Sequence, residues 1–175
     1  MLAVWIVGGI IVAVFLLTAL IGAPYVPTHK KQASAAFTTL RPVKKTDVVL
    51  DIGSGDGVVL LQALQAGVGR VVGYEINPFL VWISRLRLLR WRQNVHISVK
   101  NFWESSFPSD VTVVYTFGES RDIGKMYAKV QREATRIGKK IDFISYAFAV
   151  PNQLEKKKLG ALLLYEVSPL QKNKT

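Results

Sequence analysis

The chain has 175 residues, which is enough for one domain with its own core and too few for two domains of ordinary size. It has no cysteine, which excludes a disulfide framework, a thiolate zinc site and a cysteine nucleophile, and with only two histidines we expect no metal centre. Its 23 Lys and Arg residues outnumber its 12 Asp and Glu residues, and the formal charge of +11 favours an anionic partner, either nucleic acid or the anionic face of a membrane.

The first segment of the chain is apolar throughout. Residues 2–22 carry no charge, and about 20 apolar residues in a helix match the roughly 30 Å hydrocarbon core of a bilayer. No basic residue precedes this run, which favours an uncleaved anchor over a cleaved signal or a buried core helix. We therefore expect a single-pass transmembrane helix at residues 1–23. Because Lys30 and Lys31 are the first positive side chains, the rest of the chain is expected on the cytoplasmic side.

Short apolar strands and helical stretches alternate along the rest of the chain. A short helix is predicted at 31–40, ending before Pro42, and longer helices at 58–66, 79–92 and 123–137. Strands are predicted at 47–52, 70–76, 96–101, 111–117, 141–150 and 160–167. This order indicates βαβ units and an α/β, Rossmann-like fold. We expect a mainly parallel sheet covered on both faces, with the last run as an antiparallel edge strand after a basic linker.

A glycine-rich loop follows the first predicted strand, in the sequence Asp51-Ile52-Gly53-Ser54-Gly55-Asp56-Gly57. Glycine lets the backbone turn sharply and approach a ligand closely. Ligands of open α/β sheets bind at the carboxyl ends of the strands, where this loop lies. Glu75 ends the next strand, where a carboxylate can accept hydrogen bonds from both hydroxyls of a ribose.

The spacing of the glycines separates two kinds of cofactor. In the dinucleotide fingerprint the third glycine comes three residues after the second, but Val58 occupies that position here, and no G-K-[ST] follows to make a P-loop. A carboxylate at Asp51 would repel a pyrophosphate but suits the α-ammonium of an amino-acid cofactor. These features favour S-adenosylmethionine. The expected cofactor-binding residues here are Asp51, Gly53, Ser54, Gly55, Asp56, Gly57, Glu75, Ile76 and Asn77.

The third predicted strand ends at Asn101-Phe102-Trp103. An amide beside an aromatic surface suits a flat base that needs one polar contact, so we expect these residues to face the adenine. The alternative, that Phe102 and Trp103 belong to the core, stays open.

With these motifs in place, the chain resembles the membrane-anchored lysine N-methyltransferases, whose eukaryotic members modify subunit c of ATP synthase and the adenine nucleotide translocase. The resemblance rests on Pro-Tyr-Val-Pro-Thr at 24–28, the glycine-rich loop, Gly-Tyr-Glu-Ile-Asn-Pro at 73–78, and Asn101-Phe102-Trp103 where the family has Asp-Leu-Trp. It implies a class I methyltransferase fold and methylation of a lysine in a membrane-associated protein. It would place a eukaryotic member at the mitochondrial inner membrane. We accordingly divide the chain into an anchor (1–23), a linker and cofactor-covering segment (24–46) and a methyltransferase domain (47–175).

A lysine acceptor must lose its proton before it attacks a methyl group. A narrow apolar channel lowers the pKa of the amine by desolvation and aligns it with the methyl group. Tyr25, Thr28, Tyr115 and Phe117 are the candidate walls of this channel, and Glu119 is a candidate to orient the ammonium or take up its proton. Tyr115 to Gly118 does not reproduce a recognisable acceptor motif.

Four arginines, at 85, 87, 90 and 92, alternate with apolar residues in one predicted helix. They indicate a surface that faces anionic lipid, a nucleic-acid surface or a solvated face. With an anchor present, the lipid face needs the fewest assumptions and nucleic acid is not favoured. Two other functions stay open: methylation of a lipid, small molecule or nucleic acid, and a non-catalytic membrane interaction module.

Overall fold

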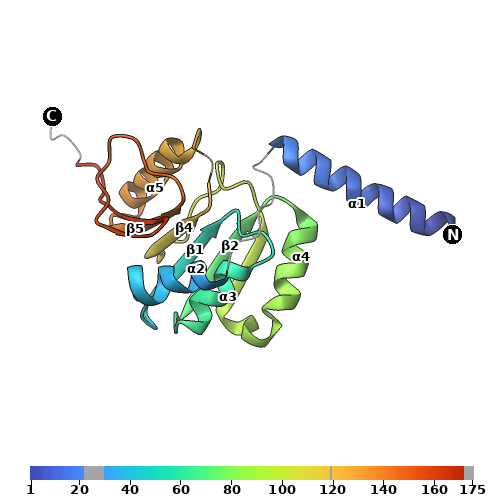
Figure 1. Ribbon diagram of the computed structural model, residues 1–175, viewed down its shortest axis with the longest axis horizontal. Helices are drawn as coiled ribbons and strands as arrows, with labels where there is room; N and C mark the ends of the chain where they lie inside the picture. The colour runs from blue at the N-terminus through green and yellow to red at the C-terminus, as the bar shows by residue number, and fades with distance from the viewer. Residues whose placement is uncertain (22–29, 119, 172–175) are drawn as a thin grey trace.

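A seven-stranded sheet lies at the centre of the computed structural model, which describes residues 1–21, 30–118 and 120–171 (Figure 1). The order across the sheet is β3-β2-β1-β4-β5-β7-β6. The strands are β1 (Val48–Ile52), β2 (Arg70–Glu75), β3 (Val95–Val99), β4 (Val113–Thr116), β5 (Ile141–Tyr146), β6 (Lys157–Leu159) and β7 (Leu162–Val167). The helices are α1 (Leu2–Ile21), α2 (Lys30–Ala35), the π-helical turn η1 (Ala36–Leu40), α3 (Val58–Gln65), α4 (Pro78–Arg87), the 3₁₀ turn η2 (Leu89–Asn94) and α5 (Ile123–Ile137).

The sheet is parallel from β3 to β5 and antiparallel beyond β5. Within the parallel part, the strands are joined by α3, by α4 with η2, and by α5, while a loop without a helix joins β3 to β4. The predicted Rossmann-like fold and its mainly parallel sheet are therefore confirmed. All five parallel strands run in the same direction, so their carboxyl ends share one edge of the sheet.

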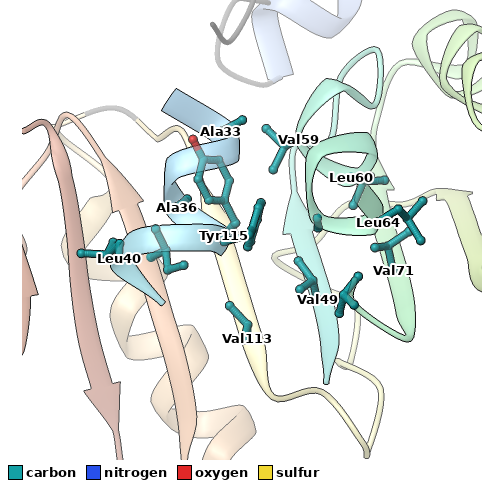
Figure 2. Close-up of a cluster of buried hydrophobic side chains, with 14 of the residues drawn as sticks. Ala33, Ala36, Leu40, Val49, Val59, Leu60, Leu64, Val71, Val113 and Tyr115 are labelled. Carbon is teal, nitrogen blue, oxygen red and sulfur yellow. The ribbon is translucent and has the colours of Figure 1, made fainter. Parts of the chain in front are cut away.

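Side chains alternate between the two faces of the sheet along each strand, and helices cover both faces. On one face, Val49, Val113 and Tyr115 pack in a cluster with α2, η1 and α3, as Figure 2 shows. On the other face, Leu50 and Val114 pack in a second cluster that includes α5. Two helical layers thus fix the position of β1, the strand that leads into the glycine-rich loop.

The last part of the sheet differs from the prediction. The strand expected at 141–150 ends at Tyr146, because Ala147 has a φ of +71° and the Ser145 hydroxyl donates a hydrogen bond to the Phe148 carbonyl at 2.7 Å, which turns the chain. The strand expected at 160–167 is β7, and it is antiparallel as predicted. It is not the edge strand, because the basic stretch that we interpreted as a linker contains β6, which pairs along its outer side. A short edge strand with exposed lysines resists pairing with another chain.

The helix predicted at 79–92 is also divided. The α-helix ends at Arg87, and the 3₁₀ turn η2 follows with non-helical backbone angles at Trp91. Hydrophobic spacing alone does not reveal this change, since both forms place apolar side chains every three to four residues.

The apolar start of the chain forms α1, which lies apart from the sheet in Figure 1. Several of its side chains are exposed, Trp5 among them at 77%. In the described ranges of the chain, no helix combines the length and the apolar character that crossing a membrane requires. The transmembrane helix that we expected at residues 1–23 stays a prediction.

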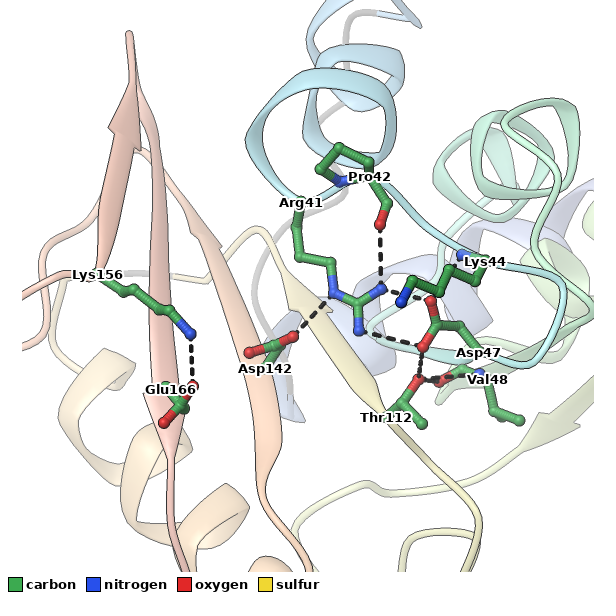
Figure 3. Close-up of polar contacts among 9 residues, drawn as sticks. All are labelled: Arg41, Pro42, Lys44, Asp47, Val48, Thr112, Asp142, Lys156 and Glu166. Carbon is green, nitrogen blue, oxygen red and sulfur yellow. Dashed lines mark hydrogen bonds and ion pairs between the residues drawn. The ribbon is translucent and has the colours of Figure 1, made fainter.

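An ion-pair network fastens the segment before β1 to the sheet (Figure 3). The Arg41 guanidinium pairs with Asp47 and donates to Asp142 on β5 at 2.8 Å. Asp47 also accepts hydrogen bonds from the Lys44 N–H at 2.7 Å and from the Thr112 hydroxyl at 2.9 Å. Burial alone would raise the pKa of Asp47, but these donors and the charge of Arg41 lower it. The Arg41 guanidinium thus links the amino-terminal ends of two strands, β1 and β5.

Candidate active site

The glycine-rich loop turns sharply between β1 and α3. Gly53, Gly55 and Gly57 all have positive φ angles, of +85°, +52° and +80°. A Cβ at Gly57 would lie 2.8 Å from the Ser84 Cβ on α4, so only glycine fits there. A Cβ at Gly53 would have no atom within 4 Å. The loop therefore packs closely against the protein on one side and borders open space on the other.

The Glu75 carboxylate is held against this loop. One of its oxygens accepts a hydrogen bond from the Gly55 N–H and the other accepts one from the Asn77 N–H, each at 2.8 Å. The side chain is buried, so two backbone donors fix its orientation. Each carboxylate oxygen keeps a further lone pair that can accept a hydrogen bond from a ligand hydroxyl.

Asp51 is the most deeply buried carboxylate in this region, with 2% of its surface exposed. Burial, followed by the nearby charges of Glu75 and Asp56, raises its pKa well above the usual value for an aspartate. Its backbone pairs with Gly73 on β2 and with Tyr115 on β4, at the centre of the sheet. A cation bound beside Asp51 would favour its ionised form and relieve the repulsion among the three carboxylates.

Two other expected residues have partners within the protein. Asp56 forms an ion pair with Arg87 of α4 at 2.8 Å, and its other oxygen accepts a long hydrogen bond from the Val58 N–H. Asn77 is buried and caps α4, because its side-chain oxygen accepts a hydrogen bond from the Phe79 N–H at 2.9 Å. The Gly-Tyr-Glu-Ile-Asn-Pro motif thus sets the start of α4 as well as the position of Glu75.

Residues Asn101 to Trp103 form a turn after β3. The Asn101 side chain bonds both to Glu104 and to the Trp103 N–H, at 2.8 and 3.1 Å. The ring centroids of Phe102 and Trp103 lie 4.3 Å apart, and both half-buried rings pack against the core. These rings contact the core and keep exposed surface, and their position beside an adenine stays a prediction. Ile76, the residue after β2, is also half-buried.

Of the predicted channel residues, the structure describes two. Tyr115 is fully buried and packs against Phe37 of η1, with ring centroids 5.9 Å apart. Figure 2 shows its ring extending from β4 toward α2. Phe117 is partly buried against Tyr146, with centroids 5.0 Å apart. Tyr25, Thr28 and Glu119 lie outside the described residues.

Among the described residues, three buried polar atoms lack a hydrogen-bond partner: Gln32 Oε1, Ser54 Oγ and Tyr115 Oη. Ser54 lies in the glycine-rich loop, and burial raises the pKa of the Tyr115 hydroxyl, with further contributions from Asp51 and Tyr146. Sequence analysis missed Gln32, and it also missed Arg87 as the partner of the loop. Neither had a local signal, because both depend on where α2 and α4 pack.

The residues present fit S-adenosylmethionine. Its methionine ammonium and sulfonium are cations, which suit the cluster of Asp51, Asp56 and Glu75, and its ribose hydroxyls suit the oriented Glu75 carboxylate. The unpartnered Ser54 hydroxyl and the open space beside Gly53 leave both a polar contact and room for such a ligand. Within the described part of the chain, no group of three or more His, Asp or Glu side chains is placed to hold a metal ion.

Known proteins resemble this chain in sequence and in fold. It is 35% identical over 145 residues to the lysine N-methyltransferase of the ATP synthase c protein from Xenopus laevis, a match that covers 76% of this chain and 62% of the relative. It is 37% identical over 87 residues to the adenine nucleotide translocase lysine N-methyltransferase of Mus musculus, covering 47% of this chain and 36% of the relative. The match thus spans less than two thirds of the length of either relative.

The fold is similar to that of an RNA methyltransferase from Salinibacter ruber solved with S-adenosyl-L-homocysteine. The TM-score is 0.71 at 23% identity, over 86% of this chain and 98% of the other. This likeness concerns the arrangement of strands and helices. The family model of the ANTKMT methyltransferase domain matches residues 51–157, from the end of β1 to the start of β6. The S-adenosylmethionine-dependent methyltransferase class expected from the sequence is thereby confirmed at the level of the family. The chain belongs to the ANTKMT methyltransferase family.

Proposed function

We propose that this chain is an S-adenosylmethionine-dependent protein-lysine N-methyltransferase that acts on a membrane-associated protein. The observation that carries the proposal is the buried Asp51 carboxylate beside an oriented Glu75, at the turn of a glycine-rich loop. The names of the relatives, lysine N-methyltransferases of the ATP synthase c protein and of the adenine nucleotide translocase, support the choice of acceptor.

Each cofactor contact has a physical basis in this proposal. Glu75 accepts hydrogen bonds from the ribose hydroxyls, and Asp51 lies near the methionine ammonium. The half-buried side chains of Ile76 and Phe102 provide apolar surface for the adenine, with Asn101 and Trp103 at its rim. The N–H groups of the loop provide further donors at the amino end of α3. When bound, S-adenosylmethionine supplies a methyl group on an activated sulfonium.

The acceptor lysine would approach from the side of α2 and β4. The Tyr115 hydroxyl, buried and without a protein partner, can accept a hydrogen bond from a neutral amine and orient it. The apolar surroundings of Tyr115 and Phe117 exclude water and favour the neutral amine. Tyr25 and Thr28 as further walls, and Glu119 as the group that takes up the proton, complete the proposed acceptor site.

The membrane is the proposed location of this reaction. The uncharged sequence of residues 2–22 supports a membrane-attached N-terminus as a single-pass anchor (1–23), with the methyltransferase domain (47–175) on the cytoplasmic side and residues 24–46 over the cofactor. Membrane fractionation tests this location: the full chain should stay with the membranes after a carbonate wash. Release into the wash would argue against an anchor.

Calorimetric titration with S-adenosylhomocysteine tests the cofactor site. We expect saturable binding that weakens about tenfold or more in Glu75→Gln, since a hydrogen bond to a charged group contributes about 1.5–3 kcal/mol. Glu155→Gln, at an exposed glutamate, is the matched control and should bind normally. Absence of binding to the folded wild-type chain would support a non-catalytic module instead.

Radiolabelled methyl donor identifies the acceptor. Membranes and cytosol are incubated with the chain and then separated into protein, lipid and nucleic acid. Label in membrane protein that survives as methyl-lysine after acid hydrolysis supports the proposal. Label confined to lipid, a small molecule or nucleic acid would overturn the lysine acceptor while leaving the cofactor site intact.

A further inference from the structure

The outer side of α4 and η2 carries an apolar stripe that no part of the described chain covers. Trp82, Leu86 and Leu89 are 58%, 52% and 60% exposed. Trp82 and Leu86, four residues apart, lie on one side of α4, and Leu89 follows at the start of η2. The half-buried Phe79 stacks on Trp82 with ring centroids 6.1 Å apart. Scattered exposed apolar residues are ordinary, but neighbouring exposed apolar residues on a helix and the turn that follows it indicate a binding surface.

Positive charge surrounds this stripe. From Pro78 to Lys100 the sequence contains no Asp or Glu. Arg85 and Arg87 have partners within the protein, since Arg85 donates to the Ile97 carbonyl at 2.6 Å and Arg87 pairs with Asp56. Arg90 and Arg92 are exposed, and the Arg90 guanidinium lies 5.7 Å from the Trp91 ring centre. These two arginines therefore supply charge that the loop and β3 do not already use.

A shallow depression adjoins the stripe. It lies between α4, η2 and β3, has a volume of about 270 Å³, and is lined by Leu89 and Val95 together with Arg85, Arg92 and His96. Since β3 is an edge strand of the sheet, this side of the domain is open. Its combination of apolar walls and cationic rim suits an amphiphile with a phosphate group.

We propose that the outer face of α4 and η2, formed by Trp82, Leu86, Leu89, Arg90 and Arg92, docks on the surface of an anionic phospholipid bilayer. Indole and leucine side chains gain free energy by entering the boundary between headgroups and acyl chains, and arginines pair with lipid phosphates. Nucleic acid offers the same negative charge but no apolar layer for Leu86 and Leu89. The exposed leucines thus favour lipid over nucleic acid.

The inner side of the same helix holds the cofactor loop. Ser84 packs against Gly57, and Arg87 pairs with Asp56. Docking would therefore hold the glycine-rich loop one helix away from the bilayer surface. Lipid docking does not require methyl transfer, so its failure and the failure of the proposed function are separate results.

The absence of cysteine makes a site-specific test direct. A single cysteine at Leu86→Cys is labelled with a polarity-sensitive fluorophore in the full chain, and a second reporter is placed at the exposed Gln93→Cys on η2. The matched control is Lys139→Cys, an exposed position after α5. Each chain is mixed with vesicles of phosphatidylcholine, with and without phosphatidylglycerol, and quenched with neutral acrylamide. All three chains carry α1, so any binding through α1 is common to them.

With anionic vesicles, we expect the quenching constants at positions 86 and 93 to fall about threefold or more, and the constant at 139 to stay unchanged. The double charge reversal Arg90→Glu with Arg92→Glu should return the quenching constants to near their values without vesicles, whereas reversal of Arg132 and Lys139 should leave the protection unchanged. Equal quenching at positions 86 and 139 would overturn the proposal. So would equal protection by uncharged vesicles, or protection by single-stranded RNA in place of anionic vesicles.

Discussion

Replacement of Asp51 by asparagine should make the ligand-free protein more stable and the cofactor complex weaker. Asp51 is 2% exposed, and its pKa is raised first by burial and then by the charges of Glu75 and Asp56. Asparagine has the same shape without the charge. A buried charge costs more than a buried neutral amide, so we expect the free energy of unfolding to rise by about 1–3 kcal/mol near neutral pH. For a chain of this length, each kcal/mol corresponds to roughly 2–4 °C in Tm.

The direction of the pH effect follows from the raised pKa. The folded state binds the Asp51 proton more tightly than the unfolded state, so the protonated carboxyl favours folding at low pH. This contribution is lost as the pH rises through the raised pKa. The difference in stability between Asp51→Asn and wild type should therefore be small near pH 4, around the ordinary pKa of an aspartate, and grow toward neutral pH.

Cofactor binding should change in the opposite direction. An ammonium beside Asp51 stabilises the ionised carboxylate, and a charge-assisted hydrogen bond contributes about 1.5–3 kcal/mol, so the affinity of Asp51→Asn for S-adenosylhomocysteine should fall about tenfold or more. Urea denaturation over a pH series and calorimetry measure the two effects. Asp56→Asn serves as the contrasting control, because it removes the partner of Arg87 and should destabilise the protein. A less stable Asp51→Asn with unchanged affinity would refute this account of the site.

Three further changes test the packing of the glycine-rich loop and two ion-pair networks elsewhere in the domain. Gly57→Ala should destabilise the fold by about 2 kcal/mol or more, because its Cβ would overlap α4 and its φ is positive. Gly67→Ala is the control: its φ is also positive but the space around it is open, so it should cost about 1 kcal/mol. Thermal unfolding measures both. Arg41→Ala should lower the free energy of unfolding by about 2–3 kcal/mol. Because the network lowers the pKa of Asp47, this difference should shrink as the pH falls below the usual range for an aspartate, and urea denaturation over a pH series measures it. Glu133→Gln should cost about 2 kcal/mol near neutral pH and flatten the loss of stability in acid, because hydrogen bonds lower the pKa of Glu133 in spite of its burial; circular dichroism at a series of pH values measures both.

The contrast between Gly57 and Gly67 shows how much local sequence conveys. Gly53, Gly55 and Gly57 were recognised from spacing alone, because a strand followed by alternate glycines requires a turn of this kind. Which glycine is sterically essential depends on Ser84, a residue of α4 that is distant in sequence. A pattern reports the backbone conformation, whereas the side chains that surround it come from other elements.

The same division applies to the charged groups. Glu75 was expected to face the loop because it ends the strand next to β1, and its bond to the Gly55 N–H agrees with that position. Arg87 was interpreted only as one of four similar arginines. Its pairing with Asp56, and the bond of Arg85 to the Ile97 carbonyl, distinguish these two from Arg90 and Arg92. Such pairs depend on the rotation of a helix about its axis, which spacing does not define closely enough.

By itself, the sequence determined the alternation of strands and helices, the glycine-rich loop, the acidic end of β2 and the methyltransferase family, because each is encoded within a few consecutive residues or in a matching motif. Only the tertiary structure decided the position of β7 between β5 and β6, the burial of Tyr115 and the repulsion around Asp51. Strand order, burial and pKa arise from contacts between segments far apart in the chain, and no local pattern carries that information.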